Sequence, residues 1–191
     1  YSFNFSNPYY TEYGVSRNIG LSYRKVDAEE ADISNYSTDS YGASLSYGIP
    51  LSEYTNYRWG VKYDSTELTT GALTSQNIVD FIAANGKLND TYQLFGSWAY
   101  DSRNRRVFAT SGNLSRLAGE IAVPGSDLEY YKVDFRQLNY FPLGKSVTLA
   151  VNLNLGYGDA IGNASGYPPY KNYFAGGSNS LRGYDANSVG P

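Results

Sequence analysis

The sequence predicts an all-β fold, a transmembrane antiparallel up-and-down β-barrel of which about eight strands are present. Three observations predict it. Apolar and polar residues alternate along segment after segment of the 191-residue chain. These segments are longer than the strands of most soluble proteins. The composition combines 21 Tyr and 20 Gly with a mean hydropathy of −0.45, as expected for strands with one apolar and one polar face.

Residues 146–158 show the alternation most clearly. The odd-numbered positions from Val147 to Tyr157 are all Val, Leu or Tyr, whereas the even-numbered positions are only Ser, Thr, Ala, Asn and Gly. A period of two places these sets on opposite faces of a strand. Two residues elsewhere break the pattern, Arg17 and Phe95. The same pattern predicts further strands over residues 1–6, 15–24, 40–49, 56–64, 91–101, 114–123 and 129–141.

Strand length favours a membrane. Strands of about 9–11 tilted residues cross a hydrocarbon layer, whereas strands in soluble proteins average about 5–6 residues. A soluble sheet would need a second layer on its apolar face, and the only candidate helix runs from Ser75 to Gly86. A two-sheet sandwich is still possible. Aromatic residues near the strand ends fit interfacial girdles better than a dry core: Tyr57, Trp59, Tyr63, Trp98, Tyr100, Tyr131 and Tyr157.

The connections alternate in length. Short ones are expected at residues 7–8, 48–50, 103–111 and 142–144, and longer ones at 28–38, 68–89 and 159–191, with a tight exception at 124–127. Short periplasmic turns and longer extracellular loops are typical of outer-membrane barrels. Charges on the polar faces are expected to form a wet lumen wall of mixed sign rather than a selectivity lining or substrate site: Arg58, Lys62, Asp64, Arg116, Glu120, Lys132, Asp134 and Arg136.

Several function classes find no support in the composition. The absence of Cys and His removes thiolate and imidazole chemistry, and no nucleophile motif points to an enzyme. A net charge of −3 without a basic cluster gives no reason to expect nucleic acid binding. No apolar run is long enough for a transmembrane helix. The acidic run at 28–32 lacks the spacing of a cation site, so no metal or cofactor is expected.

Four segments resemble the BamA family of outer-membrane barrel-assembly proteins. They are SNPYYTEYGVS at 6–16, DISNYSTDSYGASLSYGIPLSEY at 32–54, VPGSDLEYYKV at 123–133 and NYFAGGSNSLRGY at 172–184. The last is the most specific, because it resembles the family's sixth extracellular loop with its Val-Arg-Gly-Phe tip. Here the tip reads Leu181-Arg182-Gly183-Tyr184, a mild departure. The resemblance covers nearly the whole chain.

The resemblance implies a larger barrel of about 16 strands, within the range of bacterial outer-membrane barrels. The chain would supply the fourth to eleventh strands over residues 1–158, followed by an incomplete extracellular loop over 159–191. The implied protein is an integral outer-membrane protein of a Gram-negative bacterium. It would fold and insert other β-barrels without ATP, with outer-membrane lipids, unfolded client barrels and accessory lipoproteins as partners. It would be no enzyme.

Arg182 is the residue to which the resemblance gives a role. In the family the sixth loop folds back into the lumen and its Arg pairs with acids on later strands. Arg presents a planar fork of donors, and Gly176, Gly177 and Gly183 let the loop backbone fold tightly. We therefore expect Arg182 to anchor the loop by a charge-assisted bond, to an acid that the chain does not identify. A solvated surface charge is the competing interpretation.

Two alternatives come from other functional classes. A passive porin or complete small barrel is possible because eight strands can close on themselves. The tail from Asp159 to Pro191 counts against completeness, and the start at Tyr1 and end in mid-loop suggest a fragment. A related translocator of two-partner secretion shares the Arg-Gly-aromatic tip. The segments at 6–16 and 123–133 favour the assembly factor.

Overall fold

Eight strands form one antiparallel sheet in which every strand pairs with its neighbours in chain order. The computed structural model describes residues 1–27, 36–71, 74–144, 146–162, 166–177, 180–185 and 188–190. The acidic run at 28–32 lies outside them. The strands are β1 (Ser2–Asn7), β2 (Ser16–Asp27), β3 (Tyr36–Pro50), β4 (Thr55–Thr70), β5 (Leu88–Asp101), β6 (Gly112–Ala122), β7 (Tyr130–Pro142) and β8 (Thr148–Ala160). The predicted fold class is confirmed.

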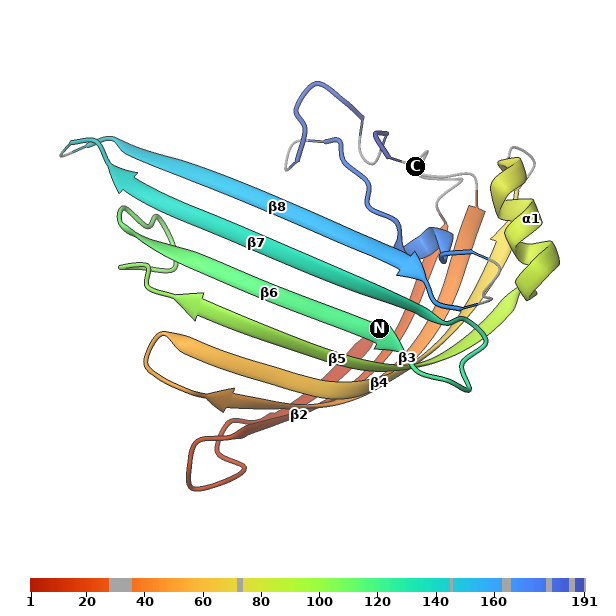
Figure 1. Cartoon of the computed structure of the whole chain (residues 1–191), viewed down its shortest axis with the longest axis horizontal. Helices are drawn as coiled ribbons and strands as arrows, with labels where there is room; N and C mark the ends of the chain where they lie inside the picture. Colours follow the sequence, from red (N-terminus) through yellow and green to blue (C-terminus); the bar gives the residue numbers. More distant parts are fainter. Residues whose placement is uncertain are drawn as a thin grey trace.

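The sheet bends into an open trough with β1 and β8 at its edges (Figure 1). Within the described residues β1 and β8 are not paired with each other, so these eight strands do not close into a small barrel. Strand direction alternates throughout, as the up-and-down prediction requires.

The convex face carries the apolar parity of every strand. The register aligns one continuous apolar row across six strands: Phe5, Ile19, Leu45, Val61, Leu94 and Ile121. All members except the half-buried Leu45 are more than a third exposed. Aromatic rings pair in tilted geometry beside this row, with centroids 5.5 Å apart for Tyr47 and Trp59 and 5.2 Å apart for Tyr63 and Tyr92. An exposed apolar belt flanked by aromatic rings is the surface that lipid requires.

The two residues that broke the alternation have local explanations. Phe95 faces the concave side, where its ring lies over Gly60, at a place with no room for a Cβ atom. Gly60 therefore leaves space for the large apolar ring of Phe95 on the polar wall. Arg17 lies on the convex side at the end of β2, where its guanidinium lies 4.3 Å from the centre of the Tyr10 ring. This contact offsets part of the cost of an outward charge.

The two ends of the sheet differ only in part as predicted, because the connection at 8–15 is longer than the expected turn at 7–8. The connections at 51–54 and 143–147 join strands at the short-turn end, whereas residues 71–87 form a long connection at the other, the long-loop end. This connection holds α1 (Gln76–Asn85), which begins after Ser75 and ends at Gly86 with φ of 84°, as the sequence predicted. Among the described residues no helix is long and apolar enough to cross a membrane.

Strands β3 and β4 run further toward the long-loop end than the alternation predicted. The pairing continues to Tyr36 and Thr70, well beyond the expected limits at residues 40 and 64. The convex face there carries Asp39 and Glu67 opposite each other instead of apolar residues. Above the lipid the outer face meets water, so the alternation ends while the backbone ladder continues. This is why a pattern based on polarity placed the strand ends too early.

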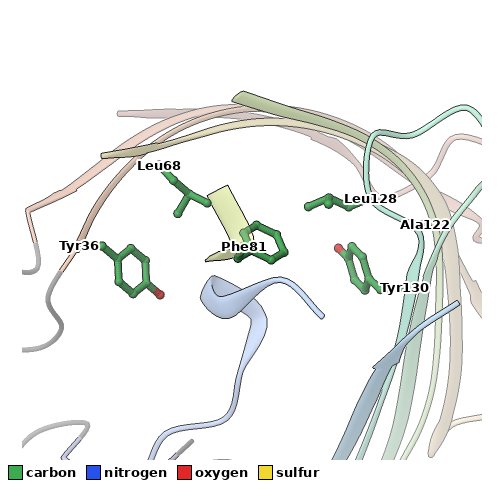
Figure 2. Packing of buried hydrophobic residues seen from close by; sticks show 6 residues of the cluster. All are labelled: Tyr36, Leu68, Phe81, Ala122, Leu128 and Tyr130. Atoms are coloured by element: carbon green, nitrogen blue, oxygen red, sulfur yellow. The ribbon is translucent and has the colours of Figure 1, made fainter. Parts of the chain in front are cut away.

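A small apolar core closes the long-loop end on the concave side. The side chains that meet there come from the ends of four strands, the turn at 123–129 and α1, as Figure 2 shows. The buried members are Tyr36, Leu68, Phe81, Ala122, Leu128 and Tyr130. The core therefore lies at one end of the trough, and the rest of the concave wall is polar.

Candidate functional site

The residues after β8 fold back into the trough instead of leaving it. Residues 166–174, called the inner segment below, include the short helix η1 (Pro169–Lys171) and lie against the concave wall (Figure 1). Pro168 is buried, and Tyr167 and Tyr170 pack on the core described above. The Tyr167 ring meets the Tyr130 ring edge-on, with centroids 5.7 Å apart. The inner segment is thus held first by apolar contact.

Gly156 and Gly158 of β8 leave space for two tyrosine rings of the inner segment, and each of these spaces is called a glycine seat below. A Cβ atom on Gly158 would lie 2.5 Å from the Tyr167 hydroxyl oxygen, and one on Gly156 would overlap the Tyr173 ring. Neither glycine has a φ in the left-handed region, so backbone conformation does not require glycine there. Glycine is required because the two rings approach the β8 backbone closely. Any larger side chain at these positions would push the inner segment off the wall.

Charged groups of the wall hold the inner segment from the other side. Lys171 forms an ion pair with Glu120 at 2.9 Å, and the Lys132 ammonium donates to the Lys171 carbonyl oxygen at 3.1 Å. The Tyr173 hydroxyl donates to the Asp134 carboxylate at 2.8 Å, and the Lys132 ammonium lies 4.0 Å from the centre of the Tyr173 ring. Hydrogen bonds to charged groups are the stronger class, contributing about 1.5–3 kcal/mol each when shielded. Both side chains of the ion pair are mostly shielded from solvent.

The tyrosine hydroxyls stay protonated at neutral pH. Burial, helped by the carboxylates of Glu120 and Asp134, raises the pKa of Tyr167 to about 12. Burial also raises the pKa values of Tyr170 and Tyr173. Because these folded-state values lie above the ordinary value of about 10, the hydroxyls' contribution is complete below pH ~10 and is lost as the pH rises through the folded-state values.

The motif predicted from the sequence lies beyond the inner segment, at the tip of a closed loop. Ala175 and Val189 exchange backbone hydrogen bonds of 2.6 and 3.0 Å, and the Gly177 amide donates to the Tyr184 carbonyl at 2.9 Å. The three motif glycines all have positive φ, 122° at Gly176, 88° at Gly177 and 92° at Gly183, a conformation that glycine adopts without strain. The glycine requirement inferred from the sequence thus has a backbone cause.

Leu181, Arg182, Gly183 and Tyr184 are all exposed at this tip. Within the described residues Arg182 has no ion pair or hydrogen bond, and the nearest acid along the chain is Asp185. The structure therefore does not bring Arg182 to any of the acids on these eight strands. The anchor expected from the sequence stays a prediction, and the contacts observed are those of the inner segment.

Sequence reasoning missed the inner segment's four contact residues, Tyr167, Tyr170, Lys171 and Tyr173. A signal was present on both sides of the contact. On β8 the concave parity changes from Asn152 and Asn154 to glycine at 156 and 158, and the tail then places three tyrosines three residues apart. The wall charges Glu120, Lys132 and Asp134, interpreted only as lumen lining, are their partners. No group of metal-ligating side chains occurs in the described part of the chain.

We predict that filling one glycine seat releases the inner segment. Gly156→Val in the full-length protein should raise amide hydrogen exchange across residues 166–174 at least tenfold (~1.4 kcal/mol), because overpacking costs about 1–3 kcal/mol. Tyr173→Phe, which keeps the ring but loses the hydroxyl bond to Asp134, should raise exchange about fivefold.

The matched control is Gly119→Val, since a Cβ at this strand glycine meets nothing closer than 3.7 Å. Unchanged exchange in Gly156→Val, or an equal rise in the control, would show that the seat does not hold the inner segment.

Comparisons with known proteins agree with this architecture. Residues 1–191 match the Omp85 superfamily domain. The chain is 31% identical over 200 residues to the outer membrane protein assembly factor BamA of Neisseria meningitidis serogroup B, covering 100% of this chain and 25% of that protein. It also resembles the crystal structure of BamA from Haemophilus ducreyi lacking POTRA domains 1–3, with a TM-score of 0.87, 28% identity, and coverage of 100% of this chain and 38% of that chain. The chain therefore belongs to the Omp85 superfamily.

Proposed function

We propose that the protein to which this chain belongs folds other β-barrel proteins and inserts them into the outer membrane, without ATP and without enzymatic chemistry. The similarity of the entire chain to the meningococcal assembly factor carries the proposal. The chain spans 25% of that relative's length, so the activity of the whole protein is inferred from the family and from the barrel wall described above.

The chain lies in the outer membrane of a Gram-negative bacterium, as its BamA relatives do. Its convex apolar face contacts lipid, and its concave polar face lines the lumen. Under the proposed function, unfolded β-barrel proteins are the clients and accessory lipoproteins are further partners. Neighbouring strands from β1 to β8 hydrogen-bond to each other, which in lipid avoids a cost of several kcal/mol for each unpaired backbone group. Under the proposed function, this hydrogen-bonded wall is the stable part of the barrel while a client folds.

We further propose that the loop of residues 159–191 is a functional extracellular loop, with Leu181, Arg182, Gly183 and Tyr184 as its working tip and Gly176 and Gly177 as its hinge. The inner segment supports this role, because it fixes the first part of the loop inside the trough through Lys171 and Glu120. The remainder can then be directed toward the lumen, where Arg182 would meet an acid of the barrel outside this chain.

The loop proposal predicts a loss on removing the Arg182 side chain. In the full-length protein, Arg182→Ala should lower barrel stability by about 1.5–3 kcal/mol, since a hydrogen bond to a charged partner would be lost. Heat-modifiable mobility on gels and the unfolding midpoint in urea measure this. Arg105→Ala, at an exposed turn of the short-turn end, is the matched control. Equal mobility and growth for both variants would mean that Arg182 is a solvated charge.

Depletion of the protein in its source organism tests the proposed function directly. We expect the levels of many unrelated outer-membrane barrels to fall together, before growth slows, because all of them would depend on one assembly step. Quantitative proteomics of isolated outer membranes is the measurement. If other barrels keep their normal levels while one secreted protein or one solute fails to cross, a translocator or a porin replaces the assembly factor.

A further inference from the structure

Three arginines lie on the concave wall without an ion-pair partner among the residues that the structure describes. Arg58 lies on β4, Arg116 on β6 and Arg136 on β7, all on the concave parity of their strands. Within the described part of the chain none of them takes part in an ion pair. All three are exposed to the trough. We call them the arginine cluster.

The register makes this arrangement costly for the folded protein. Arg116 is directly opposite Arg136 in the β6–β7 pair, and like charges in that position repel. The acids nearest to them are already engaged, since Asp134 accepts from Tyr173 and Glu120 pairs with Lys171. The inner segment therefore offsets the charge of Glu120 and occupies one oxygen of Asp134, and none of the three arginines pairs with either acid in the described residues.

A cavity of about 300 Å³ lies beside the cluster. Arg58 and Arg116 line it, together with Phe95, Glu120 and Asp134. This volume is at the lower limit of small-ligand sites, so it can accept one or two side chains. Phe95 gives it an apolar wall next to two guanidinium groups. A carboxylate neighbouring an aromatic or aliphatic side chain fits this combination, because guanidinium groups bind carboxylates in bidentate geometry.

The surrounding charge favours the same kind of occupant. The turn at 102–111, at the same end of the sheet, carries Arg105 and Arg106 as exposed side chains. The chain as a whole has a net charge of −3, so the residues outside this group of arginines carry a net negative charge. A field of one sign raises the local concentration of the opposite charge.

We propose that the arginine cluster and its cavity bind an acidic segment of an unfolded polypeptide that carries an apolar residue next to a carboxylate. The choice of a polypeptide as occupant rests on the proposed function. The concave face also favours a polypeptide over a lipid phosphate, since lipid covers the convex face. The site would hold a client chain inside the lumen beside the inner segment, whose partners Glu120 and Asp134 also line the cavity.

The test uses the full-length protein in lipid nanodiscs and two fluorescent peptides. One peptide alternates Asp and Glu with Phe, and the other replaces the acids by Asn and Gln. Fluorescence anisotropy should give at least about tenfold tighter binding of the acidic peptide, as expected for charge-assisted bonds. The difference should shrink as salt is raised.

Paired variants locate the site. Arg116→Gln with Arg136→Gln should weaken binding of the acidic peptide about tenfold or more, whereas Arg24→Gln with Lys25→Gln, which removes the same charge near the long-loop end, should change it little. Arg116→Lys with Arg136→Lys should keep most of the affinity. Heat-modifiable mobility should be unchanged in the Gln pair, because it removes two opposed like charges.

Four results would overturn the inference: equal binding of the two peptides, equal losses in the two Gln pairs, no binding because an acid of the protein itself occupies the cluster, or displacement of the peptide by glycerol phosphate at low concentration, which would indicate a phosphate site. None of them depends on the depletion experiment. If depletion lowers the levels of other barrels but the peptide experiment fails, the proposed function stands and the proposed peptide site is withdrawn.

Discussion

The antiparallel backbone ladder is the constraint on which the rest of the molecule depends. It runs without a break from β1 to β8 and fixes the parity of every side chain. A slip of one residue in any pair would move an apolar row into the lumen and a charged row into lipid. The lipid-facing row and the wall that receives the inner segment are therefore two consequences of one register.

The inner segment depends on that register in a specific way. Gly156, Gly158, Glu120 and Asp134 all lie on the concave parity, so the glycine seats and the carboxylates face the same space. The rings fill the space that the missing side chains leave, and Lys171 takes up a wall charge. One arrangement thus packs tyrosine rings against the wall, pairs Lys171 with Glu120 and gives Asp134 a hydroxyl donor, while Arg116 and Arg136 take part in no ion pair within the described residues.

Local patterns predicted much of this, and long-range contacts account for the rest. Alternation gave all eight strands, and the apolar face of residues 75–86 gave α1, because both depend on neighbouring residues. The extension of β3 to Tyr36 was missed because polarity stops alternating above the lipid. The pairing of Lys171 with Glu120, 51 residues away, has no local signature. Arg182 was singled out by resemblance, and no described contact bears on its anchor.

The face assignment can be measured in the full-length protein in bilayers. The chain has no Cys, so single Cys substitutions from 149 to 155 on β8 can each carry a nitroxide label. We predict that Leu149, Val151, Leu153 and Leu155 are the positions at which membrane-dissolved oxygen relaxes the label. A water-soluble nickel complex should do so at Ala150, Asn152 and Asn154. Equal accessibility of both parities to the nickel complex would contradict a lipid-facing wall.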